Sequence, residues 1–118
     1  MSAKSSDPTT EEYWHSLINQ SAIRFFILRV LWEKDSYGYV LSKDVKEMSW
    51  GFCEPTESTL YPALSKMETE GLIYSTAVPS KARTRKMYSI TDKGKVAFRT
   101  AAKVWNTVIP PLRQNTTL

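Results

Sequence analysis

Side chains that could recognise another molecule are concentrated near the middle of this 118-residue chain. Ser58 and Thr59 carry small hydroxyl groups, Tyr61 follows them, and Glu57 adds a carboxylate. These groups, so close together, suit a surface that approaches a partner closely and forms hydrogen bonds with it. The chain has no glycine-rich phosphate loop, nucleophile elbow or metal-binding motif. We therefore expect binding rather than catalysis, with no cofactor and no metal.

An amphipathic helix must position these groups. Leu60, Leu64 and Met67 stand at i, i+4 and i+7, which predicts one buried stripe. Gly71 marks the end of the helix. The outward face would carry Ser58, Thr59, Pro62, Ser65, Lys66 and Thr69.

Pro62 limits where this helix can begin, because proline lacks an N–H and is best tolerated in the first turn. A start at Ser58 would leave Pro62 at the end of that turn. A start at Thr56 would place Pro62 deeper and bend the helix. The sequence leaves both starts open.

The N-terminal part of the chain has helical patterns. Thr9 and Glu12 have the spacing of a capping box, which predicts a helix that opens there. The run 22–32 is strongly apolar with helical spacing. Residues 19–21 either join it to the first helix or separate the two.

The elements on either side of the central helix are a helix and a hairpin. Residues 35–36 form a turn and N-cap signal for a helix over 37–48. Residues 72–78 and 85–90 alternate in polarity, which predicts an antiparallel hairpin.

A last helix follows, with Thr91 and Asp92 at its start. Pro110-Pro111 would stop it, so we expect Leu112 to lie beyond its end. Its apolar residues recur at the three- and four-residue spacing of a coiled-coil seam, namely Phe98, Ala101, Trp105, Val108 and Leu112.

Composition limits the class of protein. The chain has the length of one domain, 42% hydrophobic residues and a net charge of +4. A single cysteine, Cys53, excludes an internal disulfide and suits a reducing cytosol. The polar N-terminus does not resemble a signal peptide, and the apolar run 23–32 is too short to span a bilayer. We expect a cytoplasmic protein with no membrane segment, and a dimer, because much of the apolar material lies in the terminal segments.

Three helices followed by a hairpin is the order of a winged helix-turn-helix, whose third helix enters the major groove of DNA. The expected fold class is therefore mainly α with a small β-hairpin (α+β), with extra N- and C-terminal dimerisation helices. The expected divisions are a disordered tail (1–8), a winged-helix DNA-binding domain with its N-terminal helix (9–92), and a C-terminal dimerisation helix and tail (93–118).

Charge favours the hairpin, or wing, as the phosphate-binding part. Residues 72–90 carry four basic and no acidic side chains, whereas residues 54–71 carry one lysine against four glutamates. The basic hairpin could also be only a solvated surface. Glu57 could accept a hydrogen bond from a cytosine N4 amine, or it could merely complement the helix dipole.

Several motifs resemble the PadR family of winged-helix transcriptional regulators. Residues 37–41 (YGYVL) are similar to the family's YGYxL helix start. Residues 59–64 (TLYPAL) with 70–73 (EGLI) resemble its recognition helix, and 85–88 (RKMY) resembles the start of its RKYYxLT segment. The match covers roughly residues 22–98. The segments 56–58 and 79–84 depart from the family pattern, since they lack its Ser-Pro-Gly and its wing-tip glycines.

The resemblance implies a sequence-specific regulator, expected to be a repressor, that binds double-stranded DNA as a homodimer. The expected DNA contacts are Tyr39, Thr56, Ser58, Thr59, Tyr61, Pro62, Lys66, Lys81, Arg83, Arg85 and Lys86. The expected dimer contacts are Tyr13, Leu17, Phe98, Ala101, Trp105 and Val108.

Compact multidrug-responsive members of this family place a tryptophan of the last helix between subunits, where it stacks on flat ligands. Trp105 occupies a comparable place, so a small aromatic effector could bind beside it, near Ala101 and Trp14. The alternative is that Trp105 only anchors the dimer core.

Other functions are less consistent with the sequence. A winged helix can serve as a protein-interaction module, with its acidic central helix facing a partner, but the basic wing favours DNA. His15 has no second ligand for a metal, so we expect it to face solvent or cap a helix. Cys53 could be a redox switch, but the sequence offers no activating neighbour, and an inert thiol is the simpler interpretation.

Overall fold

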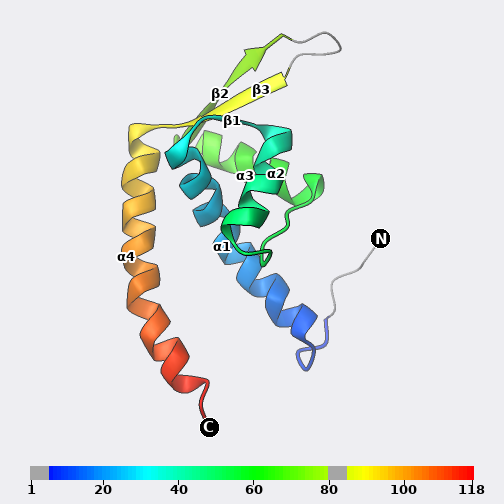
Figure 1. Cartoon of the computed structure of the whole chain (residues 1–118), viewed down its shortest axis with the longest axis vertical. Helices are drawn as coiled ribbons and strands as arrows, with labels where there is room; N and C mark the ends of the chain where they lie inside the picture. The colour runs from blue at the N-terminus through cyan, green and yellow to red at the C-terminus, as the bar shows by residue number, and fades with distance from the viewer. Residues whose placement is uncertain (1–5, 80–84) are drawn as a thin grey trace.

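The computed structural model describes residues 6–79 and 85–118. Its elements are α1 (Glu11–Glu33), β1 (Ser36–Tyr37), α2 (Gly38–Met48), α3 (Glu57–Thr69), β2 (Ile73–Val78), β3 (Arg85–Ile90) and α4 (Asp92–Asn115). The first three helices pack together, the sheet lies at one end of the molecule, and α4 runs down one side from that end (Figure 1). The expected class, mainly α with a small antiparallel β part, is confirmed, but the sheet has three strands rather than two. Among residues 6–79 and 85–118, no helix combines the length and the apolar composition that a membrane span requires.

α1 is one continuous helix of 23 residues, so residues 19–21 do not interrupt it. Its N-cap is Thr10, whose hydroxyl accepts a hydrogen bond from the Tyr13 N–H (3.3 Å). The cap expected at Thr9 is therefore wrong by one residue, because the Thr9 hydroxyl instead donates to Asp7 (2.8 Å). The buried residues of α1 all lie in its second half. The first half of α1 contributes no buried residue to the core, so its side chains can contact another molecule.

The sheet has the order β1-β3-β2, and both strand pairs are antiparallel. Residues 36–37 pair with 87–88 of β3, so they extend the wing. The N-cap expected at Asp35-Ser36 is wrong, since α2 begins at Gly38 with Tyr37 in the cap position and no side-chain capping bond. A two-residue strand is too short to show alternation in the sequence. β1 ties the start of α2 to the base of the wing.

α3, β2 and α4 meet at a close backbone crossing. Thr91 caps α4 as predicted, since its hydroxyl oxygen accepts from the Gly94 N–H (2.9 Å). The same hydroxyl donates to the Gly71 carbonyl at the end of α3 (2.6 Å). A Cβ on Gly94 would lie 2.1 Å from the Leu72 carbonyl oxygen. Only glycine therefore lets α4 leave the sheet at this point.

α4 continues through Pro110-Pro111 to Asn115. The expectation that the prolines end the helix, with Leu112 beyond it, is wrong. Each proline removes the N–H that would bond the carbonyl four residues earlier. Those carbonyls belong to residues 106 and 107, which are exposed, so water can replace the missing donors.

Aromatic rings join α4 to α1 within one chain. Phe98 stacks on Phe25 with ring centroids 5.0 Å apart, and lies 5.4 Å from the Trp32 ring. Trp105 meets Phe25 edge-on at 6.3 Å. Part of the predicted dimer seam therefore packs inside the protomer, where stacked and edge-to-face pairs stabilise the contact.

Candidate nucleic-acid interface

α3 presents the outward face that the sequence predicted. Leu60, Leu64 and Met67 are each at most 1% exposed and pack into the core. The polar side chains of the same helix point away from it. The exposed residues are Glu57, Ser58, Thr59, Tyr61, Pro62, Ser65, Lys66 and Thr69.

The structure also decides where α3 begins. Thr56 is the N-cap and Glu57 the first helical residue, so the start at Ser58 is excluded. The Thr56 side chain makes no capping bond to the backbone; its hydroxyl lies 3.0 Å from that of Ser58. Pro62 therefore stands inside the helix, beyond its first turn.

A groove of about 420 Å³ opens between the start of α2, the first turns of α3 and the base of the wing. We call it the α3–wing groove. Its lining residues are Gly38, Tyr39, Glu57, Tyr61, Arg85, Lys86 and Tyr88. Two cations from β3 and one carboxylate from α3 thus share the same concave surface.

Close packing against Gly38 sets the position of Tyr61. A Cβ at Gly38 would lie 2.9 Å from the Tyr61 hydroxyl oxygen and 3.3 Å from the Tyr88 ring. Burial is the main cause that raises the pKa of Tyr88, helped by nearby Glu68 and Tyr61, so the Tyr88 hydroxyl stays neutral. Tyr61 remains 40% exposed, and its ring forms one wall of the groove.

Aromatic stacking holds a cation at the base of the wing. The Arg85 guanidinium carbon lies 4.6 Å from the Tyr39 ring centroid, a cation–π distance. The Tyr39 ring in turn stacks on Tyr37, with centroids 5.6 Å apart. Nε of Arg85 is buried and has no hydrogen-bond partner among the described residues. The Tyr39 ring therefore contributes to the orientation of the Arg85 side chain.

The acidic segment 54–71 directs most of its charge away from this groove. Three of its four carboxylates bond to other elements, in the pairs Glu54–Lys46 (3.0 Å), Glu70–Arg24 and Glu68–Ser75 (2.9 Å). The Glu57 carboxylate makes no ion pair or hydrogen bond within the described part of the chain. Of the four carboxylates, two are therefore neutralised by ion pairs and a third accepts a hydrogen bond within the fold.

The expected DNA contacts do not all lie in the α3–wing groove. Tyr39, Tyr61, Arg85 and Lys86 line it together. Ser58, Pro62 and Lys66 are exposed on α3 outside its lining, and Lys81 and Arg83 fall outside the described residues. Sequence reasoning missed Gly38 and Tyr88 as site residues, although the YGY motif contained the first of them.

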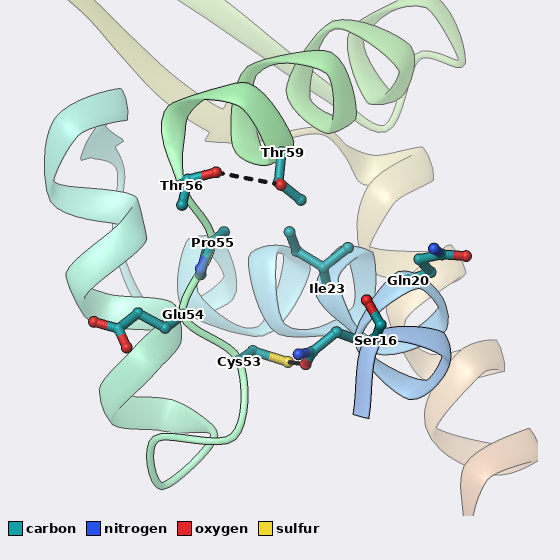
Figure 2. Close-up of a pocket in the computed structure, with 9 residues that line it drawn as sticks. Ser16, Gln20, Ile23, Cys53, Glu54, Pro55, Thr56 and Thr59 are labelled. Atoms are coloured by element: carbon teal, nitrogen blue, oxygen red, sulfur yellow. Dashed lines mark hydrogen bonds between the residues drawn. The ribbon is translucent and has the colours of Figure 1, made fainter. Parts of the chain in front are cut away.

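Thr56 and Thr59 instead face a smaller hollow of about 130 Å³ on the α1 side of α3 (Figure 2). Ile23 of α1 lies below them in that view. Cys53 lies at the other end of the hollow, where its thiol donates a hydrogen bond to Asn19 (2.8 Å). Burial raises the pKa of the Cys53 thiol, which keeps it protonated and inert.

His15 has a structural role. Its Nε2 lies 2.7 Å from the Phe52 carbonyl oxygen, and its ring stacks on the Phe52 ring at 4.0 Å. It therefore packs the loop after α2 against α1. The described residues contain no group of three side chains placed to hold a metal ion.

A second, apolar hollow of about 480 Å³ lies between parts of α1 and α4. Its lining residues are Ile18, Ala22, Phe25, Phe26, Phe52, Ala102, Trp105, Asn106 and Ile109. Trp105 and Ala102 line this hollow, which lies within one chain, whereas Ala101 is outside its lining. Trp14 is outside this lining, beside a neighbouring hollow that shares Ile18 and Phe52. Tyr13 contacts the Trp14 ring edge-on at 5.4 Å.

Comparison with known proteins gives a consistent picture. The family described as "Transcriptional regulator PadR-like family" matches residues 27–100. The negative transcriptional regulator PadR of Bacillus subtilis (strain 168) is 32% identical over 74 residues. That alignment covers 62% of this chain but 41% of the Bacillus protein, so this chain spans less than half of that regulator.

Solved structures of similar proteins share the fold. A PadR family transcription regulator from hypervirulent Clostridium difficile R20291 is 32% identical, with a TM-score of 0.70 over 80% of this chain and 98% of that one. A transcriptional regulator from Clostridium thermocellum is 27% identical, with a TM-score of 0.75 over 82% and 95% of the two chains. These relatives are named as regulators of transcription, not as enzymes. The family match spans α2, α3 and the wing, and on these grounds the chain belongs to the PadR-like family of transcriptional regulators.

Proposed function

We propose that this protein is a sequence-specific DNA-binding repressor that acts in the cytoplasm as a homodimer. The α3–wing groove is the observation that carries the proposal. Arg85 and Lys86 supply charge for phosphates, and Tyr61 of α3 supplies a hydroxyl in the same groove. Ser58 adds an exposed hydroxyl on α3 outside the groove lining. A relative named as a negative regulator supports repression.

Selection of duplex sites from random DNA tests the DNA-binding part. We expect a two-fold site with half-sites about one helical turn apart. Lys86→Ala should weaken binding to all sequences and flatten the salt dependence by about one unit per half-site. Lys34→Ala is the matched control, because Lys34 is exposed next to a different hollow. Tyr61→Phe should lower affinity for the selected site more than for random DNA.

Two results would contradict this part of the proposal. One is a single unrepeated half-site, and the other is equal affinity for every sequence. If no duplex binds at all, the winged helix serves as a protein-interaction module instead.

Exposed apolar side chains support a second copy of the chain as partner. On α1, Trp14, Leu17 and Ile18 are 54%, 43% and 48% exposed. On the distal half of α4, the exposed apolar residues are Val104, Val108, Ile109 and Leu112. Both segments extend away from the sheet (Figure 1). Apolar surface gathered in this way on two helices is typical of an interface.

Oligomeric state tests the dimer. Leu112→Glu places a charge among the apolar residues of the distal half of α4, and we expect light scattering to report a monomer. Val96→Glu is the control, because Val96 is, like Leu112, an exposed apolar residue of α4 but lies near the sheet. A dimer that is unaffected by Leu112→Glu would show that the distal half of α4 is not the interface.

We propose further that a flat aromatic effector binds in the hollow beside Trp105. A volume of about 480 Å³ and an apolar lining suit a ligand of drug size. Such a ligand relieves repression only if it prefers the DNA-free arrangement of the dimer. Titration with planar dyes, followed by tryptophan fluorescence in wild type and Trp105→Phe, tests this. Binding that is absent, or indifferent to residue 105, makes Trp105 a packing residue alone.

A further inference from the structure

We infer that Glu57 reads a C·G base pair in each half-site, an inference that rests on the DNA-binding function proposed above. Glu57 is the first residue of α3, and its side chain lines the α3–wing groove. Residues at the start of a recognition helix are the ones that contact base edges in the major groove. The position therefore brings this carboxylate to the bases and not only to the backbone.

The chemistry of a carboxylate restricts what Glu57 can read. An ionised carboxylate accepts hydrogen bonds and donates none. In the major groove, cytosine presents an N4 amine with no acceptor on the same base, whereas adenine places its N7 acceptor beside the N6 amine. The N7 lone pair would repel the second carboxylate oxygen, so cytosine is the base that Glu57 fits.

The bonding of the neighbouring carboxylates supports this assignment. Glu54, Glu68 and Glu70 are each bonded to a side chain outside the α3–wing groove. Glu57 shares the groove with Arg85 and Lys86, yet it lies within 4.0 Å of neither cation's charged nitrogens. Its oxygens therefore remain available to an incoming donor.

Electrostatics separates this role from a purely structural one. An acidic residue in the first turn also complements the helix dipole, as Glu57 does here. The dipole effect does not require the carboxylate to lie in the groove that faces DNA. In that groove, the DNA phosphates repel a carboxylate. A base contact offsets this repulsion at a C·G pair and nowhere else. Glu57 should thus lower affinity for most sequences and raise discrimination.

Site selection with Glu57→Ala and Glu57→Gln tests the inference. Wild type should require C·G at one position of each half-site, and Glu57→Ala should lose that preference by about five- to thirtyfold per half-site. Glu57→Ala should also bind random DNA more tightly than wild type, because a repelling charge is gone. Glu57→Gln should shift the preference towards A·T, since an amide both donates and accepts. Glu54→Ala is the control, because Glu54 is paired with Lys46 away from the groove.

A modified duplex gives a second readout. N4-methylcytosine still pairs with guanine but turns its methyl group into the major groove, which removes the donor. This substitution should weaken wild type and leave Glu57→Ala unchanged. Unaltered base preference in Glu57→Ala, or equal sensitivity of both proteins to methylation, overturns the role of Glu57 while sequence-specific binding by wild type still stands. If wild type itself selects no site, the proposed function fails with it.

Discussion

Replacing Tyr39 with leucine tests how the wing holds its cation. The Tyr39 ring lies 4.6 Å from the Arg85 guanidinium and is itself 56% exposed, so the contact belongs to the weaker, solvated class of cation–π pairs. Such pairs contribute about 0.5–1 kcal/mol, which corresponds to about two- to fivefold in affinity per half-site. Two half-sites in a dimer would multiply this to about four- to twenty-fivefold.

The salt dependence distinguishes orientation of Arg85 from direct contact by Tyr39. In Tyr39→Leu, Arg85 still reaches its phosphate but must be ordered on binding, so affinity falls while the salt slope stays the same. Arg85→Ala removes the contact itself and should flatten the slope by about one unit per half-site. Fluorescence anisotropy at several salt concentrations measures both quantities.

Tyr39→Phe is the matched control for this prediction, because it keeps the ring and removes only the hydroxyl. It should bind DNA as wild type does. If Tyr39→Phe loses as much affinity as Tyr39→Leu, the hydroxyl contacts DNA directly and the stacking argument is refuted. Unchanged affinity in Tyr39→Leu would refute it as well.

Three further predictions concern packing. Gly94→Ala should lower the thermal midpoint, because the alanine Cβ would lie 2.1 Å from the Leu72 carbonyl oxygen, and the free energy of unfolding should fall by about 1–3 kcal/mol or more. A raised midpoint, as expected if alanine acted only as a better helix former, would contradict the close crossing. Gly38→Ala should displace the hydroxyl end of Tyr61 and weaken specific DNA binding, as measured by anisotropy, with little change in thermal midpoint. Unchanged affinity would mean that DNA binding does not depend on the position of Tyr61. Cys53 is buried, so it should react with a maleimide only as fast as the protein unfolds; rapid labelling of the folded protein would contradict this. Because burial raises the pKa of this thiol, the free energy of unfolding should decrease as pH rises above about 8.5, the ordinary pKa of a thiol, and a free energy that does not change there would contradict the shift.

Local patterns in the sequence were enough to predict most of the elements. The buried stripe of Leu60, Leu64 and Met67 follows from the helical repeat, and the bounds of β3 follow from alternation. The cap at Thr91 is local as well, since its bond to Gly94 joins residues three apart. Each of these features depends on neighbours within a few positions along the chain. For the same reason, the exposed polar face of α3 and the basic residues at the base of the wing follow from the sequence.

Other features of the site depend on residues distant in sequence, so only the tertiary structure decided them. β1 exists because residues 36–37 meet β3 some fifty positions later, and no local pattern encodes that pairing. Glu57 is distinguished from Glu70 only by the fold, since Glu70 meets Arg24, which is 46 residues away in sequence. The direction of Thr59 towards α1, and the contact of Tyr39 with Arg85, likewise depend on how separate elements pack. A sequence pattern specifies which face of a helix is polar, but the partner of each polar group is set by whichever segment folding brings against it.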